Sequence, residues 1–184
     1  GGPFMLAVLN KIVLEYGLKH YFLKYESEDA FGNYIESTAA LLVPVEDGVA
    51  NGKQPTGENK PTLLYNHATI ATDAEVPSNS KLCIKAFRNS NTCSFSTSPV
   101  SRAAAWAAMG YVVILPDYEK LGAEASDGHH PYCQKDSFVT STEDLLFAVR
   151  KTGLAFDNRL AVAGYSEGGY AALAIHRGLE LGNY

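Results

Sequence analysis

Ser166 stands in the segment Gly164-Tyr-Ser-Glu-Gly168, between an apolar run and a stretch of helical composition. A nucleophilic serine can be presented by a tight strand-to-helix turn, which strains its backbone and exposes its hydroxyl. Bulky side chains two positions before or after it would clash with neighbouring chain, and both positions hold glycine. The chain has 16 glycines, so the bare pattern is weak and its strand-turn-helix context carries the prediction. The alternative is a glycine-rich turn that merely packs a helix onto a sheet.

Backbone N–H groups near this serine are the expected stabilisers of a developing oxyanion. The N–H of Glu167 lies at the predicted start of a helix, where it can face negative charge. A second donor is expected from Ala68 or Thr69, because both follow a predicted strand at the place where such a donor belongs. His67 is expected to position this loop and take no proton, and it is also a weaker candidate for a substrate contact. The Glu167 carboxylate is expected to face solvent or a loop.

The loops that follow the next predicted strand hold further polar residues. Asp117 is expected to orient its loop rather than to act in catalysis. Tyr118 and Tyr132 are candidates for lining a pocket for the acyl or alcohol part of a substrate. The segment 127–133 contains adjacent histidines, but its spacing matches no compact zinc pattern. We therefore interpret it as polar surface and predict neither a metal nor a cofactor.

An α/β architecture is expected to hold these residues in place. Short apolar runs without polar alternation are typical of strands buried on both faces, as in a parallel sheet. Five strands are predicted, at 21–25, 37–44, 62–65, 111–115 and 160–163. Helices are predicted at 100–109, 137–151 and 170–181, with looser helical spacing over 4–23 and an exposed loop over 46–60. From residue 61 onward strand and helix alternate, which favours right-handed crossovers in one sheet.

Composition limits the classes of partner. Hydrophobic residues make up 46% of the 184, which is enough to build the core of one domain. The formal net charge is −5 and no basic cluster occurs, so nucleic acid and anionic membranes are poor candidates. No apolar run approaches the roughly 18 residues that a spanning helix needs. Oligomeric state is left open.

Cysteines and the first residues say little about the compartment. Cys83 and Cys93 could close a small loop in an oxidising compartment and leave Cys133 unpaired, or all three could be reduced thiols. The chain begins Gly-Gly-Pro with no signal-like segment, which suggests a processed, tagged or excerpted chain. Localisation is left open.

At these residues the chain resembles the α/β-hydrolase superfamily, in particular secretory lipase-like esterases and the related prolyl-oligopeptidase-like hydrolases. The matching segments are 65–69, 75–78, 116–122, 130–132 and 164–169. The resemblance implies an α/β-hydrolase fold with a mostly parallel sheet and flanking helices. It also implies carboxylic ester substrates, often acylglycerols or short-chain esters, and slightly favours a secreted or periplasmic protein.

The residues that would complete a catalytic triad are expected outside these 184. Nucleophile-elbow enzymes order their triad as serine, acid and then histidine. Only 18 residues follow Ser166, and His176 among them lies on the helix that runs away from the serine. We therefore expect residues 1–184 to be the N-terminal part of a single α/β-hydrolase domain, truncated after that helix and inactive alone.

The predicted function is a serine carboxylester hydrolase that works through an acyl-enzyme, with a small ester or acylglycerol as substrate. A prolyl-oligopeptidase-like serine peptidase shares the same motif, and nothing in these residues separates amide from ester cleavage. A non-catalytic α/β binding module is the alternative from another class.

Overall fold

The computed structural model describes residues 17–45, 60–73, 75–79, 99–122, 128–154 and 159–182. In chain order its elements are β1 (Gly17–Glu28), β2 (Tyr34–Val45), β3 (Thr62–Asn66), α3 (Pro99–Ala108), β4 (Val112–Pro116), α4 (Lys135–Lys151), β5 (Leu160–Gly164) and α5 (Glu167–Leu181). The helical spacing expected up to residue 16, most of the loop 46–60, and the possible pairing of Cys83 with Cys93 lie outside the described residues.

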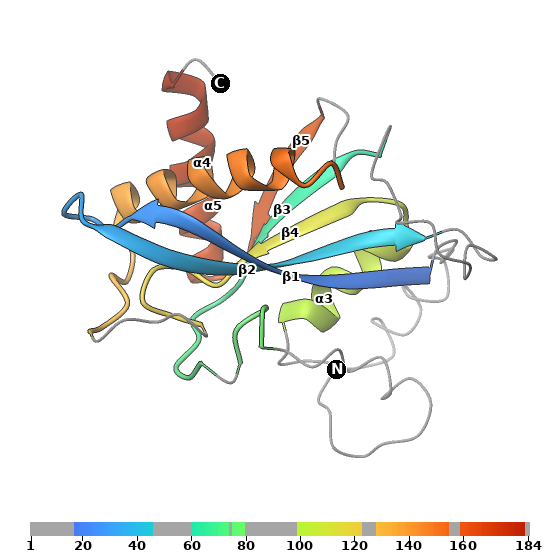
Figure 1. The fold of residues 1–184 in the computed structure, drawn as a ribbon, viewed down its shortest axis with the longest axis horizontal. Coiled ribbons are helices and arrows are strands. Elements are labelled where there is room, and N and C mark those ends of the chain that lie inside the picture. The colour runs from blue at the N-terminus through green and yellow to red at the C-terminus, as the bar shows by residue number, and fades with distance from the viewer. Residues whose placement is uncertain are drawn as a thin grey trace.

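The strands form one five-stranded sheet in the order β1-β2-β4-β3-β5 (Figure 1). The long β1–β2 hairpin is antiparallel, and β2 joins the rest of the sheet through antiparallel pairing with β4. The strands β4, β3 and β5 run parallel, so their carboxyl ends meet at one edge of the sheet. Loops at that edge surround ligands in open α/β sheets.

Helices cover both faces of the sheet, with α3 on one side and α4 and α5 on the other (Figure 1). Side chains of β2 alternate between the two faces, as a strand requires. Leu41 packs in the cluster that contains Phe138 and Ile175, whereas Leu42 packs in the cluster with Val100. Two apolar layers therefore clamp the sheet from either side.

Most predicted elements are present, with two corrections. The helical spacing expected over 4–23 is wrong at its end, because residues 17–23 belong to β1 and pair with β2. Burial on both faces is found for β3 and β4, but β5 is exposed or half-buried throughout. The reason is position: within the described part of the chain, β5 is an edge strand that pairs with β3 alone.

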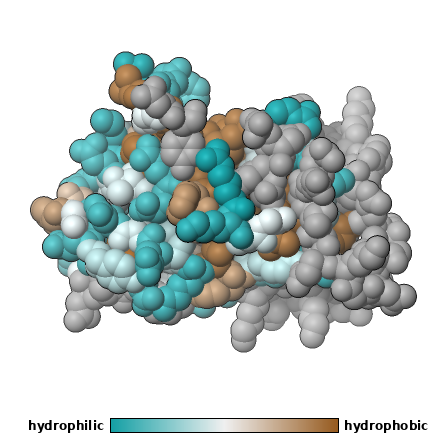
Figure 2. All heavy atoms as spheres, turned by 45° about the horizontal axis from the view of Figure 1, so that its top comes forward, coloured by the Kyte–Doolittle hydropathy of each residue, from teal (hydrophilic) through white to brown (hydrophobic). Residues whose placement is uncertain are grey.

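Among the described residues, no helix is long and apolar enough to cross a membrane. Figure 2 shows apolar side chains in separate patches among hydrophilic ones on one face of the molecule.

Candidate active site

Ser166 occupies a sharp turn between β5 and α5. Its backbone has φ 58° and ψ −121°, a combination that is rare for any residue other than glycine and costs about 1–3 kcal/mol. The N–H of Gly168 donates to the carbonyl of Tyr165 (3.0 Å), and the N–H of Gly169 donates to the carbonyl of Ser166 (2.9 Å). These bonds hold the strained turn, and the serine itself is exposed at its tip.

Close backbone packing explains why glycine flanks the serine. A Cβ atom at Gly164 would lie 1.9 Å from the carbonyl oxygen of Gly168. One at Gly168 would lie 2.1 Å from the carbonyl oxygen of Asn66. Both obstacles are backbone atoms that cannot move aside, so any side chain here would force the turn apart.

The loop after β3 lies against the first turn of α5, as the contact between Gly168 and Asn66 requires. Ala68 is half-buried and Thr69 is exposed. The N–H groups of Ala68, Thr69 and Glu167 have no hydrogen-bond acceptor among the described residues. Three unpaired donors are therefore available next to the turn that carries the serine.

His67 is a buried, neutral histidine. Its Nδ1 lies 2.7 Å from the carbonyl oxygen of Ala68, so Nδ1 carries the proton and donates it. Burial lowers the pKa of this ring from 6.5 to about 4. Nε2 has no partner in the described part of the chain. The ring thus ties the loop after β3 to itself, and a contact of His67 with substrate stays a prediction.

Tyr118 is buried beneath the same loop. Its hydroxyl donates a hydrogen bond of 2.9 Å to the carbonyl of His67. Its ring packs 4.0 Å from the His67 ring and 5.6 Å from the His130 ring, and meets Phe138 edge-on at 5.0 Å. Burial raises the pKa of Tyr118, which keeps its hydroxyl protonated as a donor.

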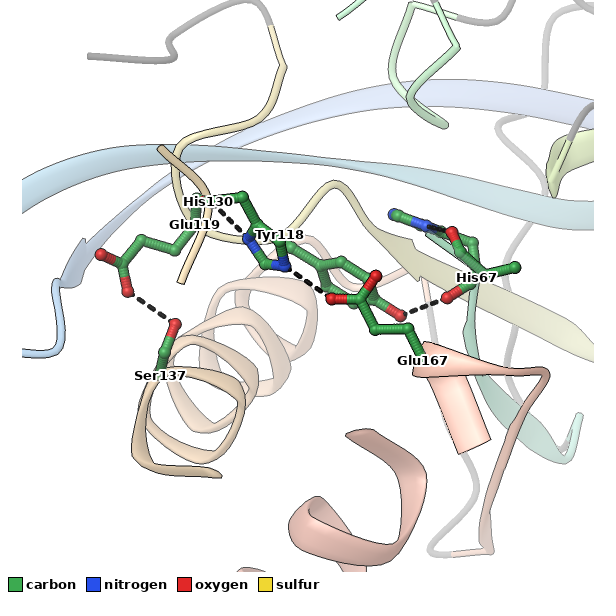
Figure 3. A network of polar contacts seen from close by, with 7 residues as sticks. His67, Tyr118, Glu119, His130, Ser137 and Glu167 are labelled. Atoms are coloured by element: carbon green, nitrogen blue, oxygen red, sulfur yellow. Dashed lines mark hydrogen bonds and ion pairs between the residues drawn. The ribbon is translucent and has the colours of Figure 1, made fainter. Parts of the chain in front are cut away.

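A buried polar network connects Glu167 to the start of α4 (Figure 3). His130 Nε2 lies 2.8 Å from Glu167 Oε1, and His130 Nδ1 lies 2.8 Å from the backbone oxygen of Glu119. The Ser137 hydroxyl donates to the Glu119 carboxylate (2.6 Å). Because a carbonyl can only accept, His130 Nδ1 carries a proton, and one more proton lies between Nε2 and Oε1.

This network decides between the two surroundings expected for the Glu167 carboxylate and corrects another sequence prediction. The Glu167 carboxylate faces the loop that holds His130 rather than solvent, since its side chain is only 1% exposed. The segment 127–133 is not simply polar surface either: His129 is exposed, but the His130 side chain is 11% exposed and paired. Both carboxylates of the network lie at helix N-termini, where the helix dipole favours negative charge.

Asp117 orients the loop after β4, as expected. Its buried carboxylate accepts hydrogen bonds from the Thr38 hydroxyl (2.5 Å), from the Ser78 N–H (2.9 Å) and from the Ser78 hydroxyl. Burial raises the pKa of Asp117, and these hydrogen bonds oppose that shift. Gly122 packs closely against this carboxylate: a Cβ atom at Gly122 would lie 2.6 Å from an Asp117 oxygen, so a side chain there would displace it.

A pocket of about 230 Å³ opens beside the loop after β3. Its lining residues are Tyr65, His67, Ala68, Thr69, Ile70, Glu75, Pro99 and Arg102. Neither Tyr118 nor Tyr132 is among them. Tyr118 is buried beneath the loop after β3 and does not line this pocket. Tyr132 is 57% exposed, and its role in lining a substrate pocket stays a prediction.

No base contacts the serine within the described residues. The structure gives Ser166 Oγ no hydrogen bond to a described histidine. His176 is exposed on α5, with Nδ1 3.9 Å from Glu180. The described residues also contain no cluster of three histidine, cysteine or acidic side chains that could hold a metal.

The sequence motifs located the site but missed the side chains that support it. In the sequence, the segments 116–122 and 130–132 resemble family motifs, but they predict no role for Glu119, His130 or Ser137. The available signal was their position: both segments follow a strand whose carboxyl end lies at the same sheet edge as Ser166. Their pairing partners lie 11, 18 and 37 positions away, which no local pattern reveals.

Comparison with known proteins identifies the fold. No family model and no curated protein sequence matches the chain. Among solved structures it is similar to a protein of Legionella pneumophila provisionally described as a hydrolase (TM-score 0.73, 23% identity, 95% of this chain and 42% of the other). It is also similar to the rice cell wall degrading esterase LipA of Xanthomonas oryzae (TM-score 0.70, 23% identity, 98% of this chain and 42% of the other). A third similar structure is Candida antarctica lipase A in its closed state (TM-score 0.56, 19% identity, 89% of this chain and 34% of the other).

These similarities confirm the expected resemblance at the level of fold, and the mixed sheet with flanking helices fits an α/β-hydrolase fold. The chain spans about two fifths of the length of the first two solved structures.

Proposed function

We propose that the chain, which shares its fold with an esterase and a lipase, carries the nucleophile and oxyanion donors of a serine carboxylester hydrolase. The observation that carries the proposal is the turn at Ser166. A serine with φ 58° and an exposed position, between a parallel strand and a helix, is the arrangement that a nucleophile elbow requires. Strain of this kind persists at functional sites because the surrounding structure holds it.

In the proposed reaction, Ser166 Oγ attacks the carbonyl carbon of an ester. The N–H of Glu167 and the N–H of Ala68 or Thr69 stabilise the negative oxygen of the tetrahedral intermediate. That intermediate collapses to an acyl-enzyme with loss of the alcohol, and water then releases the acid. Support comes from the three unpaired N–H groups beside the serine.

The general base and its acid partner are proposed to lie outside these 184 residues. Support comes from the solved structures, since the chain spans about two fifths of their length. A serine without a base to accept its proton is a weak nucleophile. We accordingly propose that residues 1–184 form the N-terminal part of the hydrolase domain and do not turn over substrate alone.

Labelling with a fluorophosphonate tests this function. The reagent phosphonylates an activated serine with loss of fluoride, and intact mass reports the adduct. The product of the complete gene should gain one adduct, the Ser166→Ala variant should gain none, and the 184-residue segment should gain none. Hydrolysis of p-nitrophenyl butyrate should fall by several orders of magnitude in the same variant.

The alternatives give different outcomes. Labelling together with cleavage of peptide amides, but not of esters, would replace the esterase with a serine peptidase. Absence of labelling on a folded complete gene product would overturn the enzyme and favour a binding module.

A further inference from the structure

We infer that Tyr118 is the positioning residue for the oxyanion donors on both sides of the site, the loop after β3 and the start of α5. The inference rests on the proposed function. It assigns to one buried side chain the task of holding two segments that are about 100 positions apart in sequence.

On the β3 side, Tyr118 fixes a peptide plane. Its hydroxyl donates to the carbonyl of His67 at 2.9 Å. In a trans peptide the carbonyl and the following N–H point in opposite directions, so this bond sets the direction of the Ala68 N–H. The next plane is fixed in the same way, because the His67 ring donates to the carbonyl of Ala68 and thereby sets the Thr69 N–H.

On the α5 side, Tyr118 acts through the ring of His130. The two rings are stacked, with centroids 5.6 Å apart and planes inclined by 17°. His130 in turn bonds the carboxylate of Glu167, the residue whose N–H is the other expected donor (Figure 3). Figure 3 shows the Tyr118 ring between His67 and the pair formed by His130 and Glu167. The first turn of α5 is therefore tied to the same side chain.

The backbone of Tyr118 is held in an unfavourable conformation by its neighbours. Its φ of 74° lies in the left-handed region, which an aromatic residue rarely adopts. The residue stays there because four contacts hold it: the bond to His67 and the packing against the rings of His67, His130 and Phe138. A conformation determined this strongly by its neighbours is suited to fixing the direction of nearby dipoles.

The test is the Tyr118→Phe variant in the complete gene product. The change removes only the hydroxyl and keeps the ring stack. We expect kcat for p-nitrophenyl butyrate to fall about 10- to 100-fold with KM within about threefold, because oxyanion donors act in the transition state. The second-order rate of fluorophosphonate labelling should fall in parallel.

Tyr25→Phe is the matched control. Tyr25 is also a buried tyrosine, and it lies on β1 opposite Ser37 of β2 rather than beneath the loop after β3. The Tyr25→Phe variant should lose about as much thermal stability as Tyr118→Phe and keep both the wild-type kcat and the wild-type labelling rate. If the wild-type protein labels at Ser166 and the Tyr118→Phe variant keeps the wild-type kcat, the positioning role is overturned while the proposed function stands. If the wild type itself does not label, the proposed function has failed.

A structure of the phosphonylated wild-type protein tests the same inference without a variant. The phosphonate oxygen should lie about 2.7–3.1 Å from the nitrogen of Glu167 and of Ala68 or Thr69, with the bond from Tyr118 to His67 intact. An adduct whose oxygen contacts neither Ala68 nor Thr69 would overturn the inference.

Discussion

Within the described part of the chain, positive φ angles mark four non-glycine residues, in loops at the sheet edge where the site lies. They are Tyr118, Lys120, Cys133 and Ser166. Each such residue costs about 1–3 kcal/mol relative to an ordinary backbone conformation. The strain is sustained by hydrogen bonds and close packing around it, as at Tyr118 and Ser166. At the residue scale the site is therefore a set of unfavourable conformations held in place by its neighbours.

His67 should make the protein sensitive to acid. Its folded-state pKa of about 4 lies below the value of 6.5 for an unfolded chain. Between these values the unfolded chain binds a proton that the folded one does not, so stability is lost as pH falls from about 6.5 to about 4. The full loss is about 3 kcal/mol.

The His67→Asn variant should lose most of this pH dependence, because the asparagine amide can still donate to Ala68 but does not titrate. Urea unfolding midpoints between pH 4 and pH 7 measure the effect. The exposed His176, replaced by Asn, is the control and should keep the wild-type slope. Equal slopes for the wild type and the His67 variant would contradict the prediction.

At the element scale, the junction of β5 with α5 depends on how closely the helix approaches β3. The first turn of α5 packs on the backbone of Asn66 through Gly168, and the Asn66 side chain donates to the carbonyl of Ala163 (3.2 Å). The strand, the turn and the helix thus form one unit with the end of β3, which brings the two sets of proposed oxyanion donors together.

Replacing Gly168 by alanine should separate these elements. The new Cβ would overlap the backbone of Asn66, and overpacking of this kind costs about 1–3 kcal/mol or more. Gly169→Ala is the matched control one position along the same helix, where the new Cβ would lie 3.8 Å from the carbonyl oxygen of Gly164, an ordinary contact distance. Alanine favours helix over glycine by up to about 1 kcal/mol, so the control should be neutral or stabilising. Chemical denaturation that ranks the two variants equally would refute this packing.

At the scale of the whole molecule, the sheet has an exposed edge at β5. Leu160 on this strand is 38% exposed, and within the described residues β5 has a partner on one side only. An unpaired strand edge is a template for pairing with another chain.

The 184-residue segment expressed alone should therefore self-associate, and Leu160→Lys should reduce that association because lysine at an edge opposes strand pairing. Leu181→Lys removes an equally apolar and more exposed side chain from the end of α5, away from the sheet, and is the control. Light scattering coupled to size-exclusion chromatography gives the mass of each. Association reduced equally by both substitutions would point to general hydrophobicity instead of the edge.

Local patterns in the sequence predict the order of strands and helices along the chain and the place of the serine turn. Apolar runs such as 62–65 and 111–115 are local signals of buried strands, and a glycine two positions either side of a serine is a local requirement of a tight turn. For the same reason the sequence misjudged β5: its apolar run reports composition, whereas its exposure depends on its place at the edge of the sheet.

The contacts that support the site form between segments that only folding brings together. The bond from His130 to Glu167 and the bond from Tyr118 to His67 join residues 37 and 51 positions apart. A polar side chain in a loop reads as surface until the fold brings a partner within hydrogen-bond distance, and burial then makes that partner necessary. A candidate nucleophile in a short motif can thus be predicted from the sequence. The side chains that position it cannot, because they contact it or each other from distant segments.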